Sequence, residues 1–400
     1  MRAVTRPLSD FVDRSVDLND VAGGDGVLFV RNAVGFAGRG VAATVPVDDA
    51  AGFLGALDRD TTVPGVGPVA LGCLPFVPGA PADLVVPAVQ VHKDADGATA
   101  VTVVGDVDDT AVAEALAPRT PRPATAASWS IEPAVDVDAY LAAVAAARDG
   151  VRAGDLTKAV IARPIMVRSS EAIDVHAVLR RLRASFGSSY RYSIDGMIGA
   201  SPELLVEVDG PVVRSHPLAG TAPRTGDVDN DARIAAELIA STKNQIEHRV
   251  VIDVVHDTLL PWASYLDWEP EPSIVTVSNV QHLCTRMEGM LSQPGPSVVE
   301  LVRALSPTPA LGGHPRVAEI VLIERTEGFE RGRYGGAVGW VDAQGNGTWA
   351  VAIRCAELAA DRRSARLVAG GGIVADSDPQ AELAETQAKF QAMLSAIVRP

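Results

Sequence analysis

The sequence has few cysteines, an excess of acidic over basic residues and no long apolar run. Its three cysteines, Cys73, Cys284 and Cys355, lie far apart and are odd in number, so they form neither a disulfide framework nor a metal-binding spacing. No stretch reaches the roughly 18 apolar residues that a membrane span needs, and the N-terminus lacks the apolar core of a signal peptide. We therefore expect a cytoplasmic protein with no membrane partner.

The charge balance narrows the class of partner. The chain has 35 Lys and Arg residues against 50 Asp and Glu residues, which gives a net charge of −15. Phosphate binding requires a basic surface, so nucleic acid is not expected as the main partner. A single site on an acidic protein can still be locally positive, and a small anionic ligand is therefore compatible with this composition.

Strands and helices are expected in an irregular alternation. Residues 1–115 alternate short Val, Ala and Leu runs with Gly, Pro and Asp, which predicts strands and tight turns. The remaining pattern predicts a surface linker at residues 117–127, a helix over residues 136–155 that stops at Gly154, and a strand over residues 156–167. It also predicts a long helix or helix pair over residues 229–262 and a final helix over residues 378–398. Regular βαβ units are not indicated, which favours an α+β fold with large antiparallel sheets.

Lys158 and Glu203 are candidates for acid–base chemistry. Lys158 lies inside an apolar strand, and Glu203 follows a proline between apolar strands. The simpler interpretation is a lysine that points outward at a sheet edge and an acid at the surface. In one shared apolar cavity, however, the lysine would serve as a general base and the carboxylic acid would stay protonated and donate a proton.

Glutamates on two predicted helices are candidates for a metal site. Glu382, Glu385 and Lys389 fall at positions i, i+3 and i+7, so they share one face of the last helix. Glu247 lies in an earlier helix, four residues after Lys243. Surface Glu–Lys pairs are the alternative. Carboxylates from two helices, without clustered Cys or His, suit a hard ion such as Mg²⁺.

Two glycine-containing segments can bring backbone N–H groups close to an anion. In "HPLAGT", Gly220 offers its amide and Thr221 its hydroxyl group. The run "VAGGGIV", which contains Gly370, lacks the G-x-G-x-x-G spacing of a dinucleotide loop, so we assign it the same anion-binding role.

Three further polar residues are candidate ligand contacts. Arg354, at the end of the predicted strand "WAVAIR", suits bidentate binding of a carboxylate, and a salt bridge at a sheet edge is the alternative. His282 and Tyr334 can donate hydrogen bonds to a ligand, although each also fits a structural role.

Eight motifs carry a family resemblance, and they cover about residues 135–395. They are "KAVIAR", "ASPELL", "HPLAGT", "STKNQIEHRVVID", "QHL", "SPTPALGGHP", "RGRYGGAVGWVDAQGNGTWAVAIRCAEL" and "AGGGIVADSDPQAELAETQAK". In this order they resemble the chorismate-utilising enzymes, the family of anthranilate synthase component I, and most of all its isochorismate synthases.

The resemblance implies a fold and a set of site residues. The fold is a single large α+β unit with two antiparallel sheets forming the core and helices outside, in which residues 1–130 form a strand-rich part of the same fold and residues 131–400 the chorismate-binding catalytic region. The resemblance also implies Mg²⁺, held by Glu247 and Glu385 with Glu382 nearby. Around chorismate it implies Arg354 and Tyr334 at the pyruvyl carboxylate, completed by Gly220, Thr221, His282, Gly370 and Lys389.

Several positions point to one member of this family. Lys158 matches the family's water-activating lysine, and Ala219 lies where aminodeoxychorismate synthases have a nucleophilic lysine, so water is the expected nucleophile. Ala310 and Leu311 favour release of isochorismate over further conversion to salicylate. Asn244 is a departure, because many relatives have an acid there.

The predicted function is Mg²⁺-dependent isochorismate synthesis, with Lys158 as the base and Glu203 as the acid. A salicylate synthase is the first alternative, and a chorismate-binding protein without catalysis is the second. We expect a monomer without a glutamine amidotransferase subunit. The sequence leaves open whether the product feeds menaquinone, siderophore or salicylate synthesis.

Overall fold

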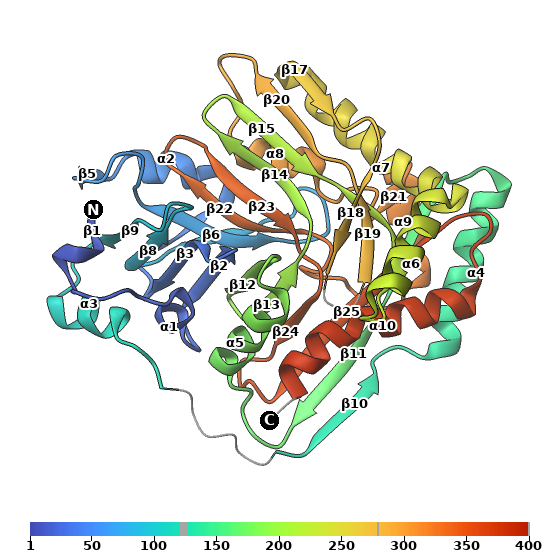
Figure 1. The fold of residues 1–400 in the computed structure, drawn as a ribbon, viewed down its shortest axis with the longest axis horizontal. Helices are drawn as coiled ribbons and strands as arrows, with labels where there is room; N and C mark the ends of the chain where they lie inside the picture. Colours follow the sequence, from blue (N-terminus) through green and yellow to red (C-terminus); the bar gives the residue numbers. More distant parts are fainter. Residues whose placement is uncertain (121–126, 278–279, 399–400) are drawn as a thin grey trace.

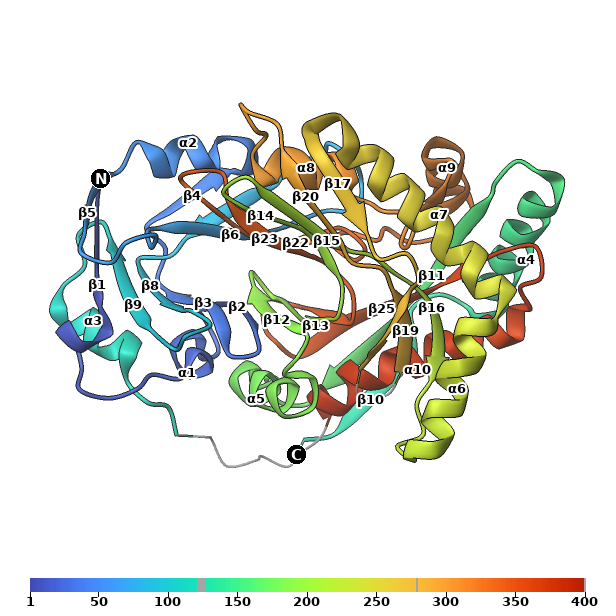
Figure 2. The ribbon, with the colours of Figure 1, turned by 45° about the horizontal axis from the view of Figure 1, so that its top comes forward.

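Two large β-sheets form the frame of the molecule in this computed structural model, which describes residues 1–120, 127–277 and 280–398. Figures 1 and 2 show the two sheets stacked one over the other, with helices on their outer sides. Residues 121–126, the middle of the predicted linker, lie outside the described residues. The α+β prediction is confirmed, and a third, small sheet is added to it.

The larger sheet has thirteen strands, in the order β10-β11-β25-β24-β13-β12-β2-β3-β8-β9-β1-β5, with β21 paired to β11. Its strands are β1 Arg2–Pro7, β2 Val27–Arg31, β3 Val34–Arg39, β5 Asp58–Thr61, β8 Val89–Lys93, β9 Thr99–Val104, β10 Trp129–Pro133, β11 Lys158–Ser169, β12 Tyr190–Ile194, β13 Met197–Ser201, β21 Gly313–His314, β24 Cys355–Leu358 and β25 Ser364–Ile373. The pairings are antiparallel apart from that of β1 with β5.

The second sheet has nine strands in the order β17-β20-β15-β14-β23-β22-β6-β7-β4, and the third has β16-β19-β18. The nine strands are β4 Ala43–Pro46, β6 Val69–Leu74, β7 Asp83–Val86, β14 Leu204–Asp209, β15 Val212–His216, β17 Ala263–Trp268, β20 Met287–Leu291, β22 Ala337–Asp342 and β23 Gly347–Val351. The three strands of the small sheet are β16 Leu218–Pro223, β18 Ser273–Thr276 and β19 Val280–Cys284.

Helices cover the outer faces and one end of the sheets (Figure 2). They are α1 Leu18–Ala22, α2 Ala50–Gly55, α3 Asp109–Leu116, α4 Val137–Ala153, α5 Val175–Phe186, α6 Val228–Ala240, α7 Thr242–Leu259, α8 Val298–Leu305, α9 Arg316–Thr326 and α10 Pro379–Val398. Within the described ranges, none of these helices is long and apolar enough to cross a membrane.

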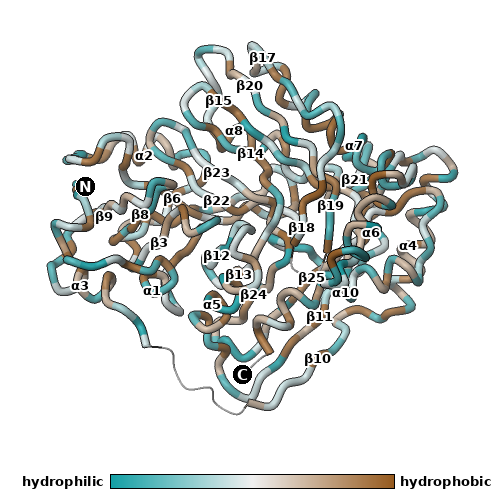
Figure 3. The backbone as a smooth tube through the Cα atoms, viewed as in Figure 1, coloured by the Kyte–Doolittle hydropathy of each residue, from teal (hydrophilic) through white to brown (hydrophobic). Residues whose placement is uncertain are grey.

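The main apolar core fills the space between the two large sheets. It joins Phe29 and Tyr192 of the thirteen-stranded sheet to Leu71 and Trp349 of the nine-stranded sheet. Figure 3 shows the apolar stretches running along the inner strands and the hydrophilic stretches in the loops and outer helices. Because strands alternate their side chains between two faces, one face of each sheet builds this core.

The helix α4 illustrates how local signals define an element. Its first turn is capped by Asp136, whose side chain accepts a hydrogen bond from the Asp138 amide. It ends at Gly154, which adopts φ +85°, a conformation that suits glycine. Its apolar residues follow helical spacing and pack on β11. The predicted helix over 136–155 is thus confirmed.

The alternative between one long helix and a helix pair over residues 229–262 is decided in favour of the pair. The chain breaks at Ser241, which has extended backbone angles and accepts a hydrogen bond from the Asn244 amide. A new helix, α7, therefore starts at Thr242 and carries Glu247 in its second turn. The break lets α6 and α7 each contact the small sheet, through β16.

Candidate active site

One cavity collects most of the predicted site residues. It lies where the small sheet, β25, α7 and α10 come together (Figure 1). Its walls include Glu203, Gly220, Thr221, Glu247, His282, Ala310, Leu311, Tyr334, Arg354, Gly370, Glu385 and Lys389. Two predicted residues, Lys158 and Glu382, do not line it and lie behind its walls.

Lys158 begins β11 and is completely buried. Its Nζ atom lies 3.0 Å from Oε1 of Glu247, a carboxylate that lines the cavity, but it has no well-aligned hydrogen bond with any described residue. The side chain passes the glycine run of β25, since an added Cβ at Gly372 would be 3.1 Å from Lys158 Cε. Lys158 thus extends from the neighbouring strand β11 over the face that Gly372 leaves open, toward Glu247, and it is not an outward-pointing residue at a sheet edge.

Glu203 lies between β13 and β14 and is 2% exposed. Burial raises its pKa to about 8, although a hydrogen bond from the Leu218 amide at 3.4 Å and the charge of Lys158 oppose the shift. The carboxyl group therefore carries its proton at neutral pH. Lys158 is thus close enough to Glu203 for its charge to act on the carboxyl group, although Glu203 lines the cavity and Lys158 does not.

His282, Thr221 and Arg354 form a connected polar wall. The Nδ1 atom of His282 lies 3.1 Å from the Thr221 hydroxyl group and 3.3 Å from the Gly220 carbonyl oxygen, and its Nε2 atom lies 3.2 Å from Nη2 of Arg354. A guanidinium group can only donate, so Nε2 of His282 accepts and Nδ1 carries the hydrogen. Burial and the charge of Arg354 hold the pKa of His282 well below its usual range, which keeps the ring neutral.

Arg354 does not lie in a strand, and that prediction is wrong. It occupies the connection between β23 and β24 with φ +52°, a conformation that costs a non-glycine residue roughly 1–3 kcal/mol. The chain turns there because the two strands belong to different sheets. The guanidinium group is 9% exposed, and no carboxylate of the described residues forms an ion pair with it. A ligand carboxylate would fill that role.

Glycines let two helices bring carboxylates against β25. An added Cβ at Gly372 would lie 2.1 Å from Oε1 of Glu247, and one at Gly371 would lie 2.6 Å from Oε2 of Glu382. Side chains at these two positions would therefore displace the glutamates. Glu247 comes from α7 and Glu382 from α10, so carboxylates from two helices reach the same glycine run.

A lysine accompanies each of the three glutamates. Lys158 pairs with Glu247 at 3.0 Å, Lys389 pairs with Glu385 at 2.6 Å, and Lys243 pairs with Glu382 at 3.3 Å. Although burial opposes it, the charges of Glu382, Glu247 and Glu385 raise the pKa of Lys243. The three carboxylates therefore act together on one cation.

This donor set fits Mg²⁺ in its chemistry. It contains only carboxylate oxygens, which are the ligands that Mg²⁺ prefers, and it already surrounds a positive charge. In the conformation described for residues 1–120, 127–277 and 280–398, no three His, Cys, Asp or Glu side chains are close enough to share one ion. Glu382 is also hydrogen-bonded to the Ser377 hydroxyl group at 2.8 Å and does not line the cavity.

Sequence reasoning missed the role of several residues around the cavity. Helical spacing predicts a surface pair of Lys243 with Glu247, whereas the ion pair of Lys243 is with Glu382 of another helix. Arg331, buried in an ion pair with Glu327, donates hydrogen bonds of 2.7 Å to the backbone of two cavity residues, Val160 and Leu311. The available signal was that Arg331 is the first residue of the matched motif "RGRYGGAVGWVDAQGNGTWAVAIRCAEL".

Asn244, the departure from the family pattern, has a local role. Its side-chain amide donates to the Ser241 hydroxyl group at 2.9 Å, and its Cβ lies 3.2 Å from the position of an added Cβ at Gly220. It helps to begin α7 beside the cavity, and it takes no part in the carboxylate cluster.

Comparison with known proteins gives the family. The family model described as "Chorismate binding enzyme" matches residues 57–398. A Mycobacterium tuberculosis relative that carries the name MenF is 39% identical over 346 residues, which is 83% of this chain and 87% of the relative. Isochorismate synthase DhbC of Bacillus subtilis is 40% identical over 281 residues, 68% of this chain and 70% of that protein.

A solved structure agrees with the fold. The menaquinone-specific isochorismate synthase MenF of Escherichia coli superposes with a TM-score of 0.82 at 23% identity, over 99% of this chain and 94% of that one. The family resemblance inferred from the eight motifs is confirmed. This chain belongs to the chorismate-binding enzyme family.

Proposed function

We propose that this protein is an isochorismate synthase that converts chorismate to isochorismate with Mg²⁺. The observation that supports this most directly is the cavity itself, which is lined by the protonated carboxylic acid Glu203 and by Glu247, the ion-pair partner of the buried Lys158. Isomerisation by water exchange requires one group that removes a proton and one that donates a proton.

The substrate would be held through its two carboxylates. Arg354, which has no carboxylate partner of its own among the described residues, and the Tyr334 hydroxyl group would bind the pyruvyl carboxylate. The ring carboxylate would lie toward Glu247 and Glu385, where Mg²⁺, when bound, supplies the positive charge that anchors it. Gly220, Thr221, Gly370 and Lys389 would complete the cradle around the ring.

The base step belongs to Lys158. Its amine takes a proton from a water molecule as that oxygen bonds to C2 of the ring. In the structure Lys158 is paired with Glu247, and an ammonium group has no lone pair to accept a proton. The ammonium group must therefore give up one proton, for which the Glu247 carboxylate at 3.0 Å is the available acceptor, before the amine can act. The proposed base, Lys158, and the proposed metal site are thus coupled, because both use the carboxylate of Glu247.

The acid step belongs to Glu203. As the ring double bonds shift, the bond from C4 to its hydroxyl oxygen breaks, and Glu203 gives its proton to that oxygen so that water leaves. One water enters and one departs, so the reaction needs no oxidant and no reductant. Burial keeps Glu203 protonated below a pH of about 8, which suits this role.

Water, not an amine, is the proposed nucleophile. Ala219 lines the cavity and its methyl group cannot attack carbon. Ala310 and Leu311 offer only apolar atoms to the substrate, which favours release of isochorismate over elimination of pyruvate. We infer that the protein acts in the cytoplasm as a monomer, without an amidotransferase subunit.

Product analysis tests the function. The purified protein is incubated with chorismate and MgCl₂, and the products are separated by chromatography. Accumulated isochorismate supports the proposal, whereas salicylate with pyruvate would make the protein a salicylate synthase. An aminated product formed with ammonium would overturn the choice of water. Chorismate binding without turnover would leave a non-catalytic binding protein.

A further inference from the structure

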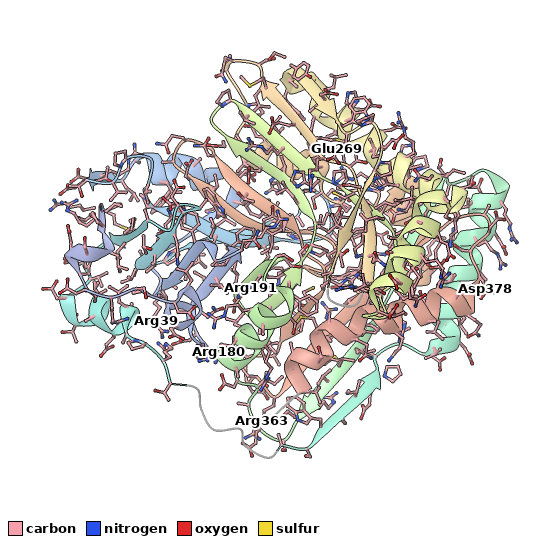
Figure 4. The ribbon with its side chains drawn as sticks, in the orientation of Figure 1. Arg39, Arg180, Arg191, Glu269, Arg363 and Asp378 are labelled. Carbon is pink, nitrogen blue, oxygen red and sulfur yellow. The ribbon has the colours of Figure 1, made fainter. Side chains whose placement is uncertain are left out.

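A second cavity lies between the N-terminal strands and α5, and it shares no residue with the catalytic cavity. Its volume is about 340 Å³. It is lined by Arg14, Ser15, Val16, Asp17, Leu18, Asn19, Asp20, Val30, Ala33, Lys93, Leu116, Pro118, Arg183 and Arg191. Figure 4 labels Arg191 on β12, close to the N-terminal strand β2 with which β12 pairs.

Arg191 is a buried charge that has no ion pair among the described residues. Its side chain is 1% exposed, and no carboxylate among residues 1–120, 127–277 and 280–398 forms an ion pair with it. Its Nη1 atom donates to Oδ1 of Asn19 at 2.9 Å, whereas its Nε atom has no partner. Burial, and then the charge of Arg183, lower the pKa of Arg191 to about 10, although the charge of Asp17 opposes the shift. An uncompensated buried guanidinium group destabilises a fold unless something supplies the missing anion.

The other charges of the cavity do not supply that anion. Asp17 forms an ion pair with Arg183, and Oδ1 of Asp20 lies 2.8 Å from Nε2 of His176. Arg14 donates only to backbone carbonyl oxygens.

Lys93 has no ion pair within the described part of the chain, and its side chain is only partly buried. Four cationic side chains therefore face two acids that already have partners. This surplus of positive charge is unusual for a protein with a net charge of −15.

The remaining walls are apolar. They come from Val16, Leu18, Val30, Ala33, Leu116 and Pro118. An inorganic anion would leave these walls in contact with water, whereas an organic acid would cover them and place its carboxylate at the arginines. We propose that this cavity is a second ligand site, which binds a small organic carboxylate between Arg191, Arg14 and Lys93.

Thermal unfolding with added anions tests the site. Sodium benzoate serves as the organic probe and inorganic phosphate as the comparison, both at constant ionic strength set with NaCl. Benzoate should raise Tm in a saturable manner. In R191M its affinity should fall by more than about tenfold, because a charge-assisted hydrogen bond is lost. In K93Q the loss should be roughly threefold, because Lys93 is partly exposed.

Two control variants distinguish a ligand site from benzoate binding in the catalytic cavity and from a purely structural role of Arg191. R354M removes the arginine of the catalytic cavity, so benzoate binding at the second site should persist in it. Without ligand, R191M should be at least as stable as the wild type, because a buried unpaired charge is gone. A large loss of stability in R191M, together with no change in the Tm of wild type or K93Q on adding benzoate, would overturn the proposal. Arg191 would then only stabilise the fold, through its hydrogen bond with Asn19. An equal effect of phosphate would overturn the assignment to an organic acid.

Discussion

The buried ion pair of Lys158 and Glu247 is the residue-scale feature on which the proposed chemistry depends. Two charges in a buried setting interact strongly and are sensitive to any change in either partner. Lys158 is too deep to contact solvent directly, and Glu247 is the charged group that it meets on the side of the cavity. A catalytic base placed in this way can be tested by removing its charge alone.

Replacing Lys158 with glutamine should lower kcat by about 10²–10⁴-fold, the usual contribution of a general base. The reason is that an amide cannot take a proton from water. Steady-state rates of isochorismate formation give the result, and circular dichroism checks that the fold is kept. R2Q, which removes an exposed cation that pairs with Asp60 and lines neither cavity, should leave kcat unchanged. A K158Q variant with more than a tenth of the wild-type rate would contradict the proposal.

The rate of catalysis at alkaline pH should depend on the protonation of the Glu203 carboxyl group. The acid must be protonated to act, and its pKa is raised to about 8. The rate should therefore hold from neutral pH up to that value and fall as the pH rises through it. A pH profile of kcat between 6 and 10, taken over a range where the fold is stable, measures this.

A second buried glutamate provides the matched control. Burial also raises the pKa of Glu319 to about 8, and neither of its carboxyl oxygens has a described partner, but it does not line the cavity. E319Q should therefore leave the alkaline fall in kcat in place. If that fall disappeared in E319Q, the titrating acid would be Glu319 and not Glu203.

Glu319 should instead affect stability. Its folded pKa of about 8 lies above the ordinary value of 4.5, so folding retains a proton that the unfolded chain releases. This contribution is complete below pH 4.5 and is lost as the pH rises through about 8. The Tm of the wild type should thus fall more steeply between pH 5 and 8 than that of E319Q, as measured by calorimetry.

The glycine run of β25 is the decisive feature at the scale of elements. Two helices that are far apart in the sequence, α7 and α10, bring their glutamates to it (Figure 1). The approach is close because Gly371 and Gly372 have no side chains. The absence of side chains at these two positions of β25 therefore makes room for the carboxylate cluster.

Adding a methyl group at Gly372 should disrupt this cluster. In G372A the new Cβ would lie 2.1 Å from Oε1 of Glu247, so the carboxylate must move. We expect Mg²⁺ to raise the Tm of the wild type but not that of G372A, and we expect G372A to lose activity. G52A is the control, since an added Cβ there meets no atom within 4 Å. An unchanged Mg²⁺ response in G372A would place the metal elsewhere.

At the scale of the whole molecule, both large sheets run through the N-terminal and C-terminal parts of the chain. Strand β2 pairs with β12, and β6 pairs with β22. The main core likewise mixes residues from both parts. Cutting the chain near residue 130 would leave two unpaired strand edges and half a core.

A chain of residues 131–400 alone should therefore fail to fold cooperatively. We expect no sharp thermal transition in calorimetry and a strong tendency to aggregate. Adding residues 1–130 as a separate chain is the complementary test, and recovery of activity would agree with one shared fold. A monomeric, cooperatively melting 131–400 fragment would mean that the N-terminal part is an independent domain.

Local signals made much of the fold predictable. The helix α4 could be placed because its cap, apolar spacing and terminal glycine all lie within one segment. The site residues could be named because motifs in the correct order carry a family pattern. The break at Ser241 was less certain, because Ser and Thr both start helices and tolerate helix interiors.

Other features depend on contacts between residues that are far apart in the sequence, and these features could not be predicted from the sequence. The strained backbone of Arg354 results from a change of sheet between β23 and β24, which no short pattern records. The second cavity could not be foreseen either, because Arg14, Lys93 and Arg191 come from three separate segments.

The sequence by itself determined the chemical groups available to this protein: a lysine, a set of glutamates, and glycines where backbone must approach closely. Only the tertiary structure decided which of them meet, since pairing across sheets and between helices sets distances that spacing along the chain does not. The partner of Lys243 is the clearest case. Helical spacing suggested Glu247, but the packing of α7 near α10 gave it Glu382, 139 residues away.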